Sequence, residues 1–87
     1  MSALKSKAII LASGPGDAST RDLLSAEILE TLKPFSLSVS DSQSIALSGR
    51  VIIALEIELD SAHASAIEKD LVSILRPKNF DVAVEIL

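Results

Sequence analysis

The residues best suited to chemistry lie in a short loop, Ser13–Ala18, between an apolar strand and the start of a helix. Gly14 and Gly16 permit backbone conformations closed to other residues, and they let a ligand approach the main chain closely. Asp17 could accept a hydrogen bond from a ligand ammonium group, while unpaired amides at the helix start could donate to the ligand carboxylate. This arrangement suits a free amino acid. The alternative is an ordinary strand-to-helix connection, in which Gly, Pro and Asp serve only the turn.

The rest of the chain offers little for catalysis. His63 is the only histidine, and we expect it on the surface in the first turn of the second helix, with no acid placed to orient it. The absence of cysteine excludes disulfides, thiol catalysis and cysteine-based zinc sites. Asp17, Asp22 and Asp41 could in principle meet, but such carboxylates usually form a solvated surface. We expect no catalytic residues, metal or cofactor here, and an enzyme hypothesis rests only on pairing of Asp17 with Asp41.

Composition bounds the class of protein. The 87 residues suffice for one domain, and with 48% hydrophobic but 2% aromatic residues its core must be built from Leu, Ile, Val and Ala. The net charge is −4 with interleaved signs, which indicates neither a nucleic-acid nor a membrane partner. The longest apolar runs, Ala8–Ala12 and Val51–Leu55, are far shorter than the ~20 residues that span a bilayer. The cytoplasm is the default location, and the apolar excess favours a subunit contact.

The first half of the chain predicts an arm, a strand and a helix. Residues 1–6 are expected to form a loose N-terminal arm before a single domain, residues 7–87. Ala8–Ala12 is apolar without alternation, as in a central strand covered on both sides. The helix should run from about Thr20 to Leu32 and end before Pro34. Its expected N-cap is Ser19 with Asp22 in a capping box, and its buried stripe is Leu24, Ile28 and Leu32.

From Phe35 the apolar period changes to two, which predicts a strand with one wet face. If this alternation continues, Asp41 and Gln43 lie on the same side of the strand as the apolar residues. Either the strand bulges there, or these polar groups face a cleft. Ser48–Arg50 supplies the turn of a hairpin.

The second half repeats the pattern of strand, helix and strand. Val51–Leu59 alternates cleanly, and Asp60 or Ser61 should cap a helix that ends before Pro77. The apolar face of this helix is expected to hold Ala64, Ile67, Leu71, Ile74 and Leu75. A last strand alternates over Phe80–Ile86. The order β-α-β-β-α-β predicts an α+β, ferredoxin-like fold, with two helices on one face of a four-stranded antiparallel sheet.

With this order of elements, the chain resembles an ACT domain, a small-ligand regulatory module. It is similar in particular to the N-terminal ACT-like segment of actinobacterial-type phosphoserine phosphatases. The resemblance covers about Lys7 to Ile86. Besides the element order, it rests on the motifs Ser13-Gly14, Val39-Ser40-Asp41-Ser42-Gln43, Gly49-Arg50-Val51 and Phe80-Asp81-Val82-Ala83-Val84-Glu85.

The resemblance implies regulation by an amino acid. Domains of this family typically pair side by side through their sheets and bind the amino acid at the interface, often with contacts from the partner chain. Carried over by position, the ligand-binding residues would be Gly14, Gly16, Asp17, Ser40 and Gln43. In the phosphatases the ligand would be serine, and the chemistry belongs to a separate, attached catalytic domain that uses magnesium. The resemblance therefore implies a homodimer and a regulatory part of a phosphoric monoester hydrolase.

The chain departs from the family at the turn into the first helix. The usual Asp-x-x-Pro-Gly is here Gly16-Asp17-Ala18-Ser19, so the Pro and Gly are lost and the acid is shifted. Loss of that Gly takes away the close backbone approach to a ligand. The alternative function is therefore a structural dimerisation module of ferredoxin-like fold that binds no ligand. The outward apolar residues Ile52, Ala54 and Ala83 motivate it.

Overall fold

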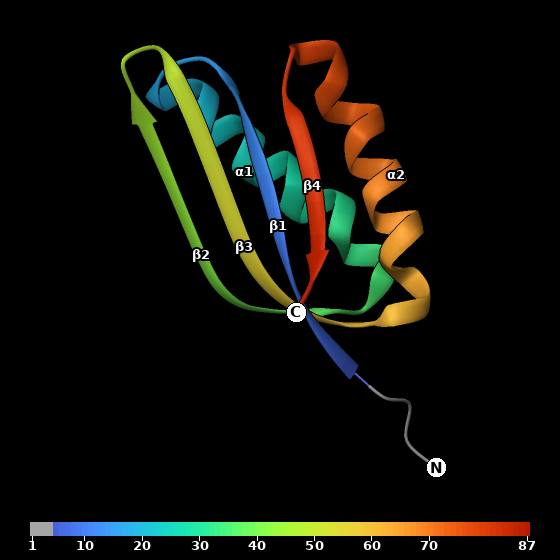
Figure 1. Cartoon of the computed structure of the whole chain (residues 1–87). Coiled ribbons are helices and arrows are strands. Elements are labelled where there is room, and N and C mark those ends of the chain that lie inside the picture. The colour runs from blue at the N-terminus through green and yellow to red at the C-terminus, as the bar shows by residue number, and fades with distance from the viewer. Residues whose placement is uncertain (1–4) are drawn as a thin grey trace.

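The computed structural model describes residues 5–87, whose elements follow in the order β-α-β-β-α-β (Figure 1). The strands and helices are β1 (Lys5–Pro15), α1 (Ala18–Leu32), β2 (Ser38–Leu47), β3 (Arg50–Asp60), α2 (Ala64–Leu75) and β4 (Asp81–Ile86). The 3-10 turns are η1 (Lys33–Phe35), η2 (Ser61–His63) and η3 (Arg76–Lys78). The strands form one antiparallel four-stranded sheet in the order β2-β3-β1-β4. The predicted ferredoxin-like α+β class is confirmed.

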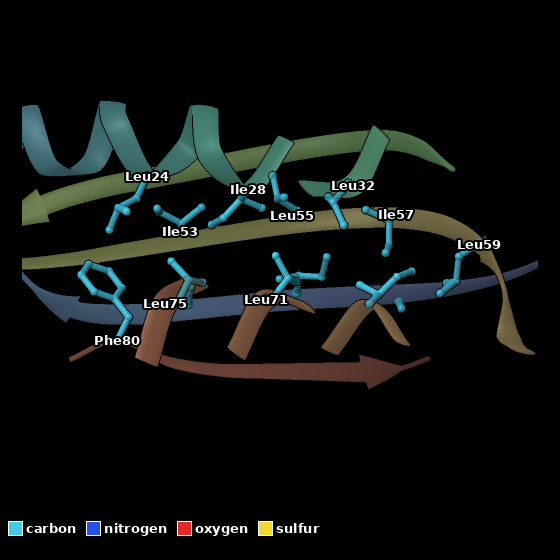
Figure 2. Packing of buried hydrophobic residues seen from close by; sticks show 14 of the residues in the cluster. Leu24, Ile28, Leu32, Ile53, Leu55, Ile57, Leu59, Leu71, Leu75 and Phe80 are labelled. Atoms are coloured by element: carbon cyan, nitrogen blue, oxygen red, sulfur yellow. The ribbon is translucent and has the colours of Figure 1, made fainter. Parts of the chain in front are cut away.

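The core lies between the sheet and the two helices, as the close view of the packing shows (Figure 2). Alternate residues of β3, from Val51 to Leu59, are all buried, which confirms the predicted alternation. Each helix contributes a stripe at a spacing of four, as expected for one buried helix face. The stripes are Leu24, Ile28 and Leu32 from α1, and Ile67, Leu71 and Leu75 from α2. We call this side of the sheet the inner face.

The opposite side of the sheet carries no helix from residues 5–87, and we call it the open face. In Figure 1 the strands pass in front of α1, so the open face is turned toward the viewer. The expectation that Ala8–Ala12 is covered on both sides is therefore wrong for the described chain. β1 alternates instead: Ile10 is fully buried on the inner face, whereas Leu11 is 45% exposed on the open face. Five apolar residues in a row are too few for their periodicity to separate these two environments.

The N-terminal boundary also differs from the expectation. β1 begins at Lys5, which pairs with Asp60 of β3, so Lys5 and Ser6 belong to the sheet. The other residues of the expected arm, 1–4, lie outside the described residues. Within residues 5–87, no helix has the length and apolar character needed to cross a membrane.

The polar stretch of β2 is explained by a bulge. The register with β3 shifts between Val39 and Asp41, which decides between the two alternatives left open by the sequence. The extra residue reverses the parity of the strand, so that Asp41 and Gln43 lie on the open face, while Ser42 and Ser44 lie on the inner face. The following hairpin turn has positive φ at both Ser48 and Gly49, as a two-residue type I′ turn requires.

The starts of both helices differ from the prediction. Asp17, not Ser19, is the N-cap of α1, and the helix begins at Ala18. Asp60 caps the 3-10 turn η2 by accepting from the Ala62 amide, whereas the N-cap of α2 is His63, so the expected cap of the second helix by Asp60 or Ser61 is wrong. The C-terminal ends follow the prediction, because α1 stops before Pro34 and α2 before Pro77. Each helix passes through a 3-10 turn into a left-handed residue, Ser36 or Asn79. These matched exits reflect the similarity of the two halves.

Candidate functional site

Gly14 serves packing at the end of β1. It is buried, and a Cβ built on it would lie 2.5 Å from the Phe80 ring. Any side chain at this position must therefore displace a ring that closes the end of the core. The close backbone approach that the sequence suggested for a ligand is taken by Phe80 within this chain.

Gly16 anchors the loop to the β2–β3 hairpin. Its φ of +150° lies in a region that L residues rarely adopt, and a Cβ would come within 2.6 Å of Thr20. Its amide donates a hydrogen bond of 2.9 Å to the carbonyl of Gly49. Gly14 is thus required by packing against Phe80 and Gly16 by the geometry of the turn, whether or not a ligand binds.

Asp17 occupies the start of α1 with its own carboxylate. Its Oδ1 accepts hydrogen bonds from the amides of Ser19 at 3.0 Å and Thr20 at 3.1 Å. The hydroxyls of the same residues donate to this oxygen at 2.8 and 3.2 Å. The hydrogen bond from the Thr20 amide is the largest cause that lowers the pKa of Asp17, and the other hydrogen bonds from Ser19 and Thr20 lower it further. The amides expected to receive a ligand carboxylate therefore already hold an anionic group.

Ser40 and Gln43 lie farther along the sheet. Ser40 sits at the bulge, and its hydroxyl donates to the carbonyl of Glu56 at 3.3 Å. Gln43, on the exposed edge strand β2, pairs with Ala54 of β3. Gly14 pairs with Val51, three positions away along β3, which is about 10 Å at 3.3 Å per residue. Within one chain, the structure brings Gly14, Gly16 and Asp17 together and leaves Ser40 and Gln43 apart from them. The expected interchain arrangement of these residues stays a prediction.

A cleft that sequence reasoning missed opens between α1 and the edge strand β2. It has a volume of about 240 Å³ and is lined on its polar side by Asp22, Ser25, Ser42 and Ser44, with Gln43 at its margin. Its apolar floor is formed by Leu29, Ile53 and Leu55. For the side of the cleft formed by α1, the sequence held a usable signal, because Asp22 and Ser25 are spaced i, i+3 and therefore lie on one face of the helix. The serines of β2 could be assigned to this side only once the bulge was located.

The lining of the cleft supports binding of a small zwitterion. The Asp22 carboxylate can accept from an ammonium group, and the serine hydroxyls can donate to a carboxylate or hydroxyl. Asp22 also accepts a hydrogen bond of 3.0 Å from Arg21 Nε. An aliphatic floor beneath a few convergent polar groups is the usual composition of small-ligand sites.

The residues that the sequence offered for catalysis lie apart from one another in the structure. His63 is exposed and lies against Phe35, with ring centroids 6.0 Å apart. Asp41 is paired with Glu56, five positions along β3 from the partner of Gly14. Asp41 therefore lies about 16 Å along the sheet from Gly14, and the structure does not bring it together with the Asp17 loop. Within residues 5–87, no group of three or more His, Asp or Glu side chains is placed to hold a metal ion.

Comparison with known proteins identifies the fold only. No family model matches the sequence, and no curated protein matches it. Among solved structures, an ACT domain protein from Streptococcus pneumoniae superposes with a TM-score of 0.67 at 14% identity, covering 93% of this chain and 89% of that one. A putative glycine cleavage system transcriptional repressor gives a TM-score of 0.78 at 12% identity, over 97% of this chain and 47% of the other.

A third similar structure is formyltetrahydrofolate deformylase from Burkholderia mallei, with a TM-score of 0.77 and 13% identity over 93% of this chain. This chain spans 28% of the length of that enzyme and 47% of the repressor, so it matches one part of each. At such identities the likeness establishes a shared fold. The chain has the fold found in ACT domain proteins.

Proposed function

We propose that this chain is a regulatory domain of the ACT type that binds a free amino acid in the cleft between α1 and β2. The cleft is the observation that carries the proposal, because it combines one carboxylate, three hydroxyls and an aliphatic floor. The shared fold with an ACT domain protein supports it. A bound amino acid would connect α1 to β2, the edge strand available for pairing with a second copy. Binding and subunit association would then be coupled.

Serine is the first ligand to test. The resemblance to the N-terminal segment of phosphoserine phosphatases favours it, and its hydroxyl would find partners among Ser25, Ser42 and Ser44. In that case the chain would act on a phosphatase, as an attached domain or as a separate partner in serine biosynthesis. An Asp-x-Asp-x-Thr/Ser motif downstream in the same reading frame would support the attached form.

A thermal-unfolding screen with the twenty amino acids tests ligand binding. A ligand at ~100 times its Kd should stabilise the domain by ~2.7 kcal/mol, a shift of roughly 10 °C or more for a domain of this size. Asp22→Asn should remove most of this shift, because the amide cannot match a charged acceptor for the ammonium group. The matched control is Asp70→Asn, an exposed acid of α2, which should keep it.

The same screen can overturn the proposal in two ways. If none of the amino acids stabilises the domain at millimolar concentration, it is not an amino-acid sensor. If Asp22→Asn and Asp70→Asn respond alike, an amino acid binds, but not in the α1–β2 cleft.

The second candidate is a dimerisation module without a ligand, favoured by the length of the exposed edge. β2 offers ten residues of edge strand, Ser38–Leu47, without proline or lysine, and beyond the bulge between Val39 and Asp41 its residues 41–47 keep a regular register. A second copy could add its own β2 to this edge and extend the sheet. Sedimentation equilibrium separates the candidates. A dimer that no amino acid affects supports the module, and a monomer at millimolar concentration removes it.

A further inference from the structure

An apolar stripe crosses the open face of the sheet diagonally, from β2 to β4. In register, Leu11 of β1 lies between Ala54 of β3 and Ala83 of β4. Beside them, Ile45 of β2 pairs with Ile52 of β3. The larger side chains are well exposed: Leu11 by 45%, Ile45 by 49% and Ile52 by 40%. We call these residues, together with Ile9, the open-face stripe.

Four acidic residues border the open-face stripe, and none of them has a basic residue opposite it on a neighbouring strand. Ile9 lies between Glu56 and Glu85 in register, and Glu56 in turn lies opposite Asp41. A fourth acid, Asp81, pairs with Ser13 on the other side of the stripe. Within residues 5–87 the ion pairs are Arg21–Asp22 and Lys33–Glu30, so none of these four acids has an ion-pair partner there. The cations of this face, Lys5, Lys7 and Arg50, stand at the strand ends.

Two features of this border cost the isolated domain stability. Asp41 and Glu56 are like charges directly opposite each other on neighbouring strands, a destabilising pair. The stripe beside them leaves aliphatic side chains in water. Both costs would be relieved by one kind of occupant, which covers the stripe with apolar groups and brings positive charge to the acids.

The shape of the face fits a helix. Alanines at positions 54 and 83 flank Leu11, so the side chains on either side of it in register are small and Leu11 stands open to a partner. A shallow hollow lies to one side of Leu11, over β3 and the part of β2 next to the bulge, and is lined by Ile9, Asp41, Ser42, Gln43, Ala54, Leu55 and Glu56. Helices pack on sheet faces through such apolar surfaces, without needing free backbone hydrogen-bonding groups. The inner face of this sheet is already packed in that way by α1 and α2.

We infer that the open face is the docking surface for a basic amphipathic helix of a partner protein. Leucine or isoleucine at i, i+3, i+4 and i+7 of that helix would cover the open-face stripe, and flanking Lys or Arg would reach Asp41, Glu56, Glu85 and Asp81. A second copy of this chain would bring the same acids against each other. Nucleic acids and anionic lipids would be repelled by the same charges. The inference is independent of the amino-acid proposal, because the cleft lies on the inner side of the sheet.

The test uses the whole chain and a synthetic helix of 18 leucine and lysine residues with one apolar stripe. Nuclear magnetic resonance titration should move the amide signals of Ile9, Leu11, Ala54 and Ala83, and should leave those of α2 in place. Fluorescence anisotropy should give saturable binding that weakens as salt rises. Two control peptides are needed: one of the same composition in scrambled order, and one with glutamate in place of lysine. Both should bind at least about tenfold more weakly.

A pair of charge-reversed variants locates the contact. Glu56→Lys with Glu85→Lys should weaken binding of the basic helix about tenfold or more, while folding, followed by circular dichroism, is retained. The control reverses the same number of charges on α2, Glu68→Lys with Asp70→Lys, and should bind nearly as wild type.

Four results would each overturn the inference: no saturable binding, equal binding of the scrambled peptide, equal loss in both double variants, or signal changes confined to the helices. Self-association of the wild-type chain that Leu11→Lys abolishes would assign the open face to a second copy instead.

Discussion

The two faces of the sheet are built from the same aliphatic residues and differ in what surrounds them. Ile10 and Leu11 are neighbours in β1, yet Ile10 is fully buried under the helices and Leu11 is 45% exposed. Among the residues that the structure describes, no charged or polar residue is buried on the inner face. On the open face acids stand among the apolar residues, with Glu56 and Glu85 on either side of Ile9. The inner face therefore specifies the fold, while the open face is free to specify a contact.

The most direct test of this comparison truncates the side chains of Ile10 and Leu11 to alanine, one at a time. Ile10→Ala should lower the free energy of unfolding by about 2–5 kcal/mol, because it leaves a cavity in a closed core. Domains of this kind are stable by about 5–15 kcal/mol, so the loss is severe. Leu11→Ala should cost no more than about 0.5 kcal/mol. Urea unfolding at equal m-values measures both changes.

Equal losses in the two variants would contradict the comparison. They would mean that the open face is covered in solution, and dilution should then reduce the loss in Leu11→Ala if the cover is a second copy. A small loss in Ile10→Ala would instead mean that the inner face is less tightly packed than the structure has it.

The second prediction concerns Gly14, at the end of the inner face. Gly14→Ala should destabilise by about 1–3 kcal/mol, because the new methyl group would overlap the Phe80 ring. The loss should shrink in a Phe80→Leu background, where the smaller side chain leaves room. A double-mutant cycle by urea unfolding measures this coupling. Strictly additive losses would show that Gly14 is needed for another reason, such as ligand approach.

The inner face was the part that the sequence predicted well. Period-two alternation over Val51–Leu59 and the spacing of four over Ile67, Leu71 and Leu75 each match one buried surface, so the fold class followed from them. The open face was harder, because Ala8–Ala12 reads as apolar throughout and its periodicity does not show which side is covered. Whether helices cover one side of a strand or both depends on where all the helices pack, and the sequence of a single strand does not determine this.

The candidate site was predictable only in part, and for local reasons. Ser19 and Asp17 are both good N-cap residues, and the competition was decided by a carboxylate that reaches two amides and two hydroxyls at once. The serines of the cleft depend on the bulge between Val39 and Asp41, which parity could suggest but not locate. Ser40 and Gln43 came from the resemblance, and their role stays a prediction.

The smallest expected effect lies at the loop, where the contribution of Asp17 can be separated by pH. The pKa of Asp17 is lowered, chiefly by the Thr20 amide, below the value near 3.9 of an unperturbed aspartate. A lowered pKa in the folded state stabilises the fold above the unfolded pKa, and this stabilisation is lost as the pH falls through the folded pKa. Asp17→Asn keeps a good N-cap without the charge, while Asp17→Ala removes the cap.

Urea unfolding at pH 7 and at pH 3 compares these variants with the wild type. At pH 7 Asp17→Ala should be less stable than wild type, by less than Gly14→Ala, because the site is fully exposed. Asp17→Asn should lie close to wild type at pH 7 and should lose less stability than wild type on acidification. Identical acid dependence in Asp17→Asn and wild type would show that the carboxylate does not cap α1 in solution. The amides at the helix start would then be available to a ligand, and the loop would replace the α1–β2 cleft as the first site to examine.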